Sequence, residues 1–209
     1  MKLIGDRITI EDLKLEDVYE MKNWGTHENI LLDDYNFPFS EDADIKRWYY
    51  VKTKPFGNHY YSVRNENGIL IGYFGIKNKR YLLRYAYLGI VFDPNYLDRG
   101  YGTETFMTFL PYYFTKMKMR ILYLEVAEFN DRAYHLYQKV GFEKIAYYLD
   151  VFPNQNIDIR NPYFVQKRDS FVIEDGIIYQ QIYRMKLTKN RFFSLFKDGD
   201  KNGFYTRNN

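Results

Sequence analysis

The sequence predicts an α+β fold, in which a central, twisted and mostly antiparallel mixed sheet of about seven strands is flanked by about four helices. Two observations indicate it: a hairpin signal between apolar runs in the first half, and a strand–helix–strand–helix–strand order over residues 83–149. The hydrophobic fraction of 46% is sufficient for a core. We expect one domain over residues 1–189, with an irregular insertion at residues 150–176 and a flexible tail at residues 190–209.

The N-terminal part alternates short elements with turns. Residues 7–11 alternate as a strand, and residues 16–24 carry apolar side chains at helical spacing until Gly25 ends the helix. An irregular segment follows, and Ser40 is the expected N-cap of a second helix that continues to about residue 53.

An antiparallel meander is predicted next. Residues 59–65 and 69–76 are joined by Asn67-Gly68, a strong hairpin signal. A second turn, placed around Asn78, leads into a strand at residues 83–92.

The pattern then changes to alternating helices and strands. A glycine-containing turn opens a helix whose apolar stripe reaches Met117, with Pro111 off that stripe. A strand at residues 121–126 is followed by a helix that Asn130 or Asp131 can cap and that Gly141 ends.

The C-terminal third returns to strands. Residues 142–149 are predicted to be extended, and the insertion follows them. Residues 171–173 and 177–187 are expected to pair as a hairpin around Asp175-Gly176.

Composition excludes several classes of protein. The 30 basic and 27 acidic residues nearly cancel, and a net charge of +3 gives no reason to expect a nucleic-acid partner. The absence of cysteine excludes disulfides and thiolate chemistry, and the three histidines show no metal-ligand spacing, so no metal is expected. No stretch is long and apolar enough for a membrane span, and no signal peptide is recognisable at residue 1. We therefore expect a cytoplasmic protein.

The pair Gly100 and Gly102 lies at the expected start of a helix. Glycines there let the backbone approach a phosphate, the free N–H groups of the first turn donate to it, and Thr103 adds a hydroxyl. Alone, such a pair is more often an ordinary turn. No Lys-Ser/Thr follows as in a Walker loop, and the third glycine of a dinucleotide fingerprint is missing.

A second segment, NDRAYHLYQKVGF at residues 130–142, lies one strand further on. Together the two segments resemble motifs A and B of the GNAT N-acetyltransferase superfamily, within it most similar to the branch of the ribosomal-protein alanine acetyltransferases. The resemblance covers residues 1–150 in element order and residues 83–142 in motif. It implies an enzyme that uses acetyl-CoA as co-substrate.

The resemblance also assigns residues. The strand before the turn would hold the pantetheine arm through Ile90, Val91 and Phe92. The turn would cradle the pyrophosphate with Leu97, Asp98, Arg99, Gly100, Tyr101, Gly102 and Thr103. Leu97 departs from the family's Gln/Arg at its position, which removes one side-chain contact. Asn130 would contact the coenzyme, and Tyr137 would lie near the thioester sulfur.

The chemistry of thioester aminolysis indicates roles for a few side chains. The leaving thiolate needs a proton, which Tyr137 can supply as general acid because a phenol stays protonated at neutral pH. Without the resemblance, Tyr137 would be read as a core residue of its helix. Glu125, at the end of a strand beside the expected cleft, is the predicted general base, although a strand-end glutamate can be merely solvated. Glu104, His27 and Glu28 are weaker alternatives.

Three functions remain open at this point. The leading hypothesis is a transferase that acetylates a primary amine of a small molecule, a protein N-terminus or a lysine, as a monomer or homodimer. The alternative is a non-catalytic acetyl-CoA-binding regulatory or scaffold module of the same fold. An RNA-associated protein that uses its aromatic residues, 20% of the chain, is a weaker third. The acceptor would be recognised by residues 24–45 and 150–176, which contain no motif.

Overall fold

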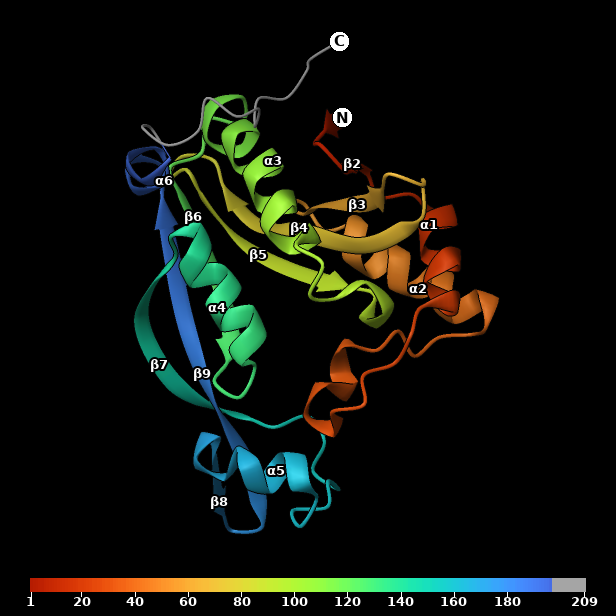
Figure 1. The fold of residues 1–209 in the computed structure, drawn as a ribbon, viewed down its shortest axis with the longest axis vertical. Helices are drawn as coiled ribbons and strands as arrows, with labels where there is room; N and C mark the ends of the chain where they lie inside the picture. The colour runs from red at the N-terminus through yellow and green to blue at the C-terminus, as the bar shows by residue number, and fades with distance from the viewer. Residues whose placement is uncertain (197–209) are drawn as a thin grey trace.

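A single mixed sheet organises the computed structural model, which describes residues 1–196; residues 197–209, most of the expected tail, lie outside the described part. Among residues 1–196, the 9-stranded sheet has the order β1-β2-β3-β4-β5-β6-β9-β7, with β8 paired to β9 (Figure 1). Neighbouring strands are antiparallel except β5 and β6, which are parallel. The predicted α+β class with a mostly antiparallel sheet is confirmed.

The elements follow the predicted order. The described strands are β1 (Lys2–Ile4), β2 (Ile8–Asp12), β3 (His59–Asn65), β4 (Leu70–Arg80), β5 (Tyr85–Phe92), β6 (Ile121–Ala127), β7 (Glu143–Val151), β8 (Phe171–Glu174) and β9 (Ile177–Thr188). The α-helices are α1 (Leu15–Glu20), α2 (Asp42–Thr53), α3 (Tyr101–Thr115), α4 (Asp131–Val140), α5 (Pro162–Gln166) and α6 (Lys189–Leu195). Short 3₁₀ segments are η1 (Met21–Asn23), η2 (Ile30–Tyr35), η3 (Pro94–Tyr96) and η4 (Arg168–Ser170).

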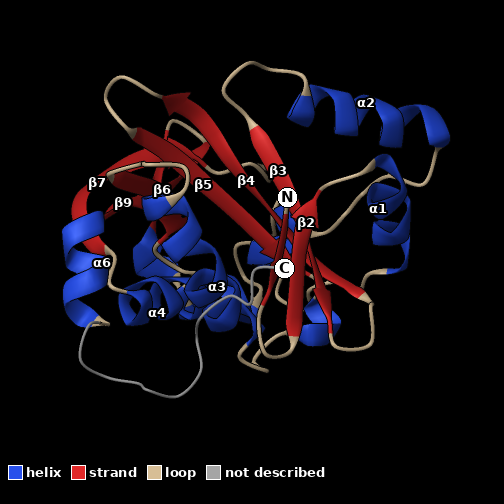
Figure 2. Ribbon diagram, turned by 90° about the horizontal axis from the view of Figure 1, so that it is seen from above, coloured by secondary structure: helices blue, strands red, loops and turns tan. Residues whose placement is uncertain are grey.

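The two faces of the sheet carry different helices. Helices α1 and α2 lie on one face and α3, α4 and α6 on the other (Figure 2). Side chains alternate along each strand, so Phe74 and Ile76 of β4 belong to the main core with α3. Tyr73 of the same strand packs in the smaller core with α1 and α2. Strand β4 therefore presents one set of side chains to each helical layer.

The first hairpin forms where the Asn67-Gly68 pair predicts it. Gly68 has a φ of 75°, and the Asn65 carboxamide oxygen accepts hydrogen bonds from the backbone N–H groups of Asn67 and Ile69. The second turn was misplaced. Strand β4 continues past Asn78, whose φ of 53° falls within an irregularity of the β4–β5 pairing, and the turn lies at residues 81–84.

Three N-terminal expectations need correction. Strand β1 was not predicted, because three residues are too few to show an alternation. Ser40 does not cap α2; Glu41 flanks the helix, and its side chain makes no cap hydrogen bond. The segment expected to be irregular contains η2, whose first turn is capped by the Asn29 side chain, which accepts from the Leu31 N–H.

The expected insertion at residues 150–176 is more ordered than its composition suggests. It contains the end of β7, α5, η4 and β8, and extends from the body of the molecule (Figure 1). Its apolar side chains Phe152, Ile157, Phe164 and Phe171 are buried with Leu31 and Leu32 of η2 in a separate small core. The insertion therefore packs against the segment that follows α1.

The expected flexible tail from residue 190 was wrong in its first part. Residues 189–195 form α6, whose N-cap Thr188 accepts a hydrogen bond from the Arg191 N–H. Phe192 is buried in the main core against Phe114 of α3, with ring centroids 5.6 Å apart. A helix of 7 residues directly after a strand gives no periodicity long enough to detect.

We predict that Phe192→Ala lowers the free energy of unfolding by about 3–5 kcal/mol, as expected for a buried phenylalanine that leaves a cavity. Urea unfolding followed by circular dichroism would measure the loss. Leu195→Ala, on the same helix but 49% exposed, should change stability by under about 1 kcal/mol. Equal losses in both variants would contradict the packing of α6 described above.

Candidate active site

The sheet opens where β5 and β6 separate. Their parallel pairing covers Tyr85 with Ile121 through Leu88 with Leu124 and then stops. Beyond it, β5 continues to pair with β4 as far as Phe92, and β6 continues to pair with β9. The edge of β5 over residues 89–92 that faces β6 therefore has no strand partner. The residues expected to hold the pantetheine arm, Ile90, Val91 and Phe92, lie on this edge.

The chain leaves β5 through a turn that starts α3. Asp93 accepts hydrogen bonds from the N–H groups of Asn95 and Gly25, which ties the turn to the end of η1. Gly100 is the N-cap residue with a φ of 83°, in the left-handed region that favours glycine. The first intrahelical bond runs from the Glu104 N–H to the Gly100 carbonyl. The N–H groups of residues 101–103 therefore have no acceptor within the helix.

An ion pair between the exposed Arg7 and the buried Glu104 fixes this turn from the N-terminal side. The Arg7 guanidinium lies 3.0 Å from the Glu104 carboxylate and donates to the Arg99 carbonyl at 3.1 Å. It also stacks over the Tyr101 ring at 4.8 Å, and the Arg7 backbone N–H donates to Glu104 at 2.6 Å. Glu104 is thus fully engaged in holding the turn, which leaves it no part as a catalytic base.

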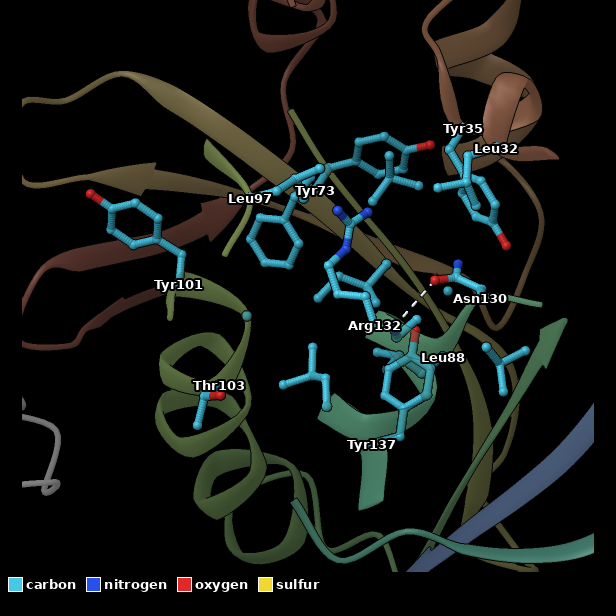
Figure 3. A pocket seen from close by; sticks show the side chains of 18 of the residues that line it. Leu32, Tyr35, Tyr73, Leu88, Leu97, Tyr101, Thr103, Asn130, Arg132 and Tyr137 are labelled. Atoms are coloured by element: carbon cyan, nitrogen blue, oxygen red, sulfur yellow. Dashed lines mark hydrogen bonds between the residues drawn. The ribbon is translucent and has the colours of Figure 1, made fainter. Parts of the chain in front are cut away.

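Helix α4 forms the opposite wall. The Asn130 side chain caps it by accepting a hydrogen bond from the Ala133 N–H at 3.2 Å (Figure 3). That bond occupies the carboxamide oxygen and leaves the amide N–H groups to donate elsewhere. At the other end, Gly141 closes the helix with a φ of 103°.

A cavity of about 460 Å³ lies between these walls. It is bounded by β5, the turn before α3, the start of α3, the end of β6 and α4. The predicted site residues on its wall are Ile90, Val91, Phe92, Leu97, Asp98, Gly100, Tyr101, Gly102, Thr103, Glu125, Asn130 and Tyr137. Arg99 is not on this wall; its guanidinium lies over the Tyr96 ring at 5.1 Å, on the side of Asp93 and Asn95.

Tyr137 is both a core residue and a cavity residue. Its side chain is 7% exposed, and its ring lies 5.9 Å from the rings of Phe106 and Phe142, in an edge-on arrangement with Phe106. Figure 3 shows its hydroxyl pointing into the cavity, on the side where Asn130 and Arg132 lie. Burial raises the pKa of Tyr137 above its ordinary value, so the phenol remains protonated.

Glu125 lies on the cavity wall but is already paired. The Arg184 guanidinium donates two hydrogen bonds to one oxygen of its carboxylate, at 2.8 and 3.0 Å. Because Arg184 is on the neighbouring strand β9, directly opposite Glu125, the pair spans the sheet surface. The carboxylate oxygen that accepts both bonds is therefore already engaged by a cation.

His27 lies on the same wall, whereas Glu28 is exposed and not part of it. Burial, followed by the charge of Arg132, lowers the pKa of His27 below its ordinary value. The imidazole is therefore neutral at neutral pH and able to accept a proton. As a proton acceptor, His27 is therefore better suited than Glu125, although the sequence had favoured Glu125.

Several wall residues were not named individually from the sequence, although Leu32 and Tyr35 lie in the segment 24–45 expected to recognise the acceptor. Leu32 and Tyr35 come from η2, Lys52 from the end of α2, and Tyr60, Tyr73 and Lys77 from β3 and β4. Only the alternation of β3 and β4 could have indicated the last three, and only once the face occupied by α2 was known. Figure 3 shows Leu32 and Tyr35 opposite Tyr137 across the cavity.

The wall fits a long ligand that carries phosphates at one end and an acyl thioester at the other. Unpaired N–H groups at the start of α3 suit a pyrophosphate. The free edge of β5 suits the amide groups of a pantetheine arm, and Tyr137 lies at the far end of that edge. Two other features are absent from the described part of the chain. Among residues 1–196 no group of three or more His, Asp or Glu side chains could hold a metal ion. None of the helices described there is long and apolar enough to cross a membrane.

Comparison with known proteins identifies this architecture. The model of the acetyltransferase (GNAT) family matches residues 24–142. A spermidine N(1)-acetyltransferase of Vibrio cholerae serotype O1 is 22% identical over 167 residues, which cover 79% of this chain and 96% of that protein. The N-alpha-acetyltransferase RimI of Mycobacterium tuberculosis is 34% identical over 91 residues, 43% of this chain and 54% of that protein.

Solved structures agree on the fold. The spermidine N-acetyltransferase of Vibrio cholerae in complex with CoA and spermine superposes with a TM-score of 0.67 at 21% identity, covering 89% of this chain and 98% of that one. The chain belongs to the acetyltransferase (GNAT) family. It is an N-acetyltransferase that uses acetyl-CoA as acyl donor and an amine as acceptor.

Proposed function

We propose that the cavity binds acetyl-CoA along the free edge of β5, with the pyrophosphate at the N-terminus of α3 and the thioester beside Tyr137. The observation that carries this proposal is the separation of β5 from β6 beyond Leu88, directly opposite the glycine turn and the Tyr137 hydroxyl. The departure at Leu97 removes a side-chain contact, so the backbone N–H groups of residues 101–103 supply the phosphate contacts.

A substitution at Gly102 tests the coenzyme site. A Cβ placed there would lie 2.8 Å from Leu136 Cδ2 and 3.6 Å from Phe92 Cε2, both on the cavity wall. We predict that Gly102→Val abolishes the rise in melting temperature caused by acetyl-CoA, because the added side chain fills the phosphate end of the cavity. Gly102→Ala should give an intermediate shift. Differential scanning fluorimetry with and without acetyl-CoA measures both.

The ligand-free Gly102 variants serve as the control. Both should unfold cooperatively at a melting temperature close to that of the wild type, since alanine and valine are better helix formers than glycine. A full acetyl-CoA shift in a folded Gly102→Val protein would place the pyrophosphate elsewhere and refute this assignment.

The reaction needs one net proton movement. The acceptor nitrogen bonds to the thioester carbonyl carbon, the carbon–sulfur bond breaks, the nitrogen loses one proton and the sulfur gains one. Tyr137 donates a hydrogen bond and then its proton to the departing sulfur. Burial raises its pKa well above the thiol value of about 8.5, so the proton moves together with bond cleavage and is regained from solvent afterwards.

We propose that His27, rather than Glu125, accepts the proton that the attacking amine loses. The support is chemical: His27 is neutral at neutral pH because burial lowers its pKa, whereas Arg184 engages Glu125. His27→Gln should then lower kcat/KM by about tenfold or more, while Glu125→Gln has a smaller effect. Steady-state rates of both variants at saturating acetyl-CoA decide between them, and the reverse order would restore Glu125 as the base.

The proposed role of Tyr137 as general acid can be tested by removing its hydroxyl. Tyr137→Phe keeps the ring contacts with Phe106 and Phe142 and deletes only the hydroxyl. We predict a fall in kcat of roughly a hundredfold or more, within the general-acid range of about 10²–10⁴. Stability should change by about 1 kcal/mol, and acetyl-CoA affinity should be nearly unchanged.

The rate of thiol release in single-turnover experiments, where chemistry limits the rate, measures the effect of Tyr137→Phe on catalysis. Tyr134→Phe is the matched control, since Tyr134 is on the same helix but packs on Tyr183 at 5.2 Å, outside the cavity. Full activity in Tyr137→Phe would make Tyr137 a core residue, and the departing thiolate would then leave unassisted or take its proton from water. Because burial raises the pKa of Tyr137, its ionisation should not reduce kcat below about pH 10.

The acceptor is proposed to be a primary amine that enters from the face of α1 and α2. Lys52, Tyr60, Tyr73 and Lys77 line the cavity on that face, and the residues of η2 close its side. The insertion at residues 150–176 packs on η2 and so supports this entrance indirectly. The oligomeric state, a monomer or homodimer, stays a prediction.

A further inference from the structure

Two lysines stand on the acceptor side of the cavity. Lys52 is in the last turn of α2, Lys77 is on β4, and both are half-buried. The alternation of β4 places Lys77 on the face of Tyr73, with α2, because Phe74 and Ile76 face the other core. Their flexible side chains therefore converge from two different elements on one cavity.

Neither lysine has an acidic partner among residues 1–196: the ion pairs found there involve neither ammonium. The Nζ of Lys52 lies 5.6 Å from the centre of the Trp48 ring. Burial and then the charge of Lys77 lower the pKa of Lys52, which reflects the proximity of the two cations. Half-buried, unneutralised charges on a cavity wall are expected to attract an anion.

The position of Lys77 separates this anion from the coenzyme phosphates. A Cβ placed on Gly89 would lie 3.1 Å from the Lys77 Nζ, so this ammonium lies across Gly89, next to the point where β5 and β6 separate. The glycine turn is beyond Phe92, three residues further along β5, or about 10 Å. The absence of a side chain at Gly89 provides the room that the ammonium occupies.

Acidic groups on the same wall do not reverse its charge. Glu125 is paired with Arg184, and Asp98 lies 3.9 Å from Arg132 on the coenzyme side. A polyamine would bring further positive charges toward Lys52 and Lys77, and like charges at close range are unfavourable. The acceptor side therefore carries positive charge, whereas a polycationic acceptor would require negative charge there.

We propose that the acceptor is a small amine that also carries an anionic group, a carboxylate or a phosphonate-like group, held by Lys52 and Lys77 while its amino group faces the thioester. This inference rests on the proposed transferase function and narrows its acceptor class. Each ammonium group would attract the anion by its charge and could donate several hydrogen bonds to it.

The test compares three-carbon acceptors that differ in charge, with spermidine added as a longer polyamine. β-Alanine and 3-aminopropylphosphonate carry an anion, β-alaninamide and propylamine are neutral at that end, and 1,3-diaminopropane and spermidine are cationic. We expect kcat/KM by thiol release to favour the anionic amines over β-alaninamide by about tenfold or more, as for one charge-assisted hydrogen bond. The diamine should be the poorest of the three-carbon acceptors.

Substitutions of Lys52 and Lys77 test whether these side chains cause the preference for anionic amines. Lys77→Met and Lys52→Met should each reduce the anion preference to near unity, mainly through KM, with acetyl-CoA affinity unchanged, and Lys77→Arg should retain part of it. Lys79→Met is the matched control, because Lys79 is on the same strand but lies over Tyr81 and does not line the cavity. It should keep the wild-type preference.

Each contrary result has a distinct meaning. Preference for spermidine or 1,3-diaminopropane over β-alanine overturns the anionic acceptor while leaving the transferase intact. A loss of acetyl-CoA affinity in Lys77→Met assigns the lysines to the coenzyme and overturns the inference as well. Failure of every amine, polyamines included, to release CoA overturns the proposed function itself.

Discussion

The separation of β5 from β6 is the constraint on which the active site depends. Four residue pairs hold the two strands together, from Tyr85 with Ile121 to Leu88 with Leu124. Each strand then follows a different antiparallel partner, β4 or β9, so neither can return to the other. The opening is thus built into the pairing of the whole sheet. The Arg7–Glu104 pair ties α3 to the connection between β1 and β2, and the Asn130 side chain caps the start of α4.

The same strands divide the cavity into two chemical environments. Because side chains alternate, Leu88, Ile90 and Phe92 of β5 face the core of α3, and the odd positions face α2. The coenzyme side offers backbone donors at the start of α3, and the acceptor side offers Lys52 and Lys77. The acyl donor and the amine acceptor can then approach from opposite faces of the sheet and meet where β5 and β6 separate. The glycine at position 89 matters for this, since a side chain there would displace the Lys77 ammonium.

Local signals explain which parts could be predicted from the sequence. The Asn67-Gly68 turn, the glycine turn before α3 and the Asn130 cap depend on residues that lie next to one another in the chain. The residues that motif resemblance assigned to the cavity also line it, apart from Arg99, whose cation–π contact with Tyr96 points it away. What was missed depends on distant contacts: η2 is held by the insertion, α6 by Phe114, and the acceptor wall by the face that α2 covers. No window of sequence contains those contacts.

Tyr137 shows why a residue assigned to the core and a residue assigned to catalysis can be the same one. A proton donor must stay protonated and must hold one orientation, and burial between Phe106 and Phe142 supplies both, by raising its pKa and by confining its ring. Its hydroxyl points into the cavity (Figure 3). The cost is acid strength, since a phenol with a raised pKa gives up its proton only when the acceptor's charge is forming. A departing thiolate meets that requirement during bond cleavage, which makes a buried phenol suitable where a stronger acid would already be ionised.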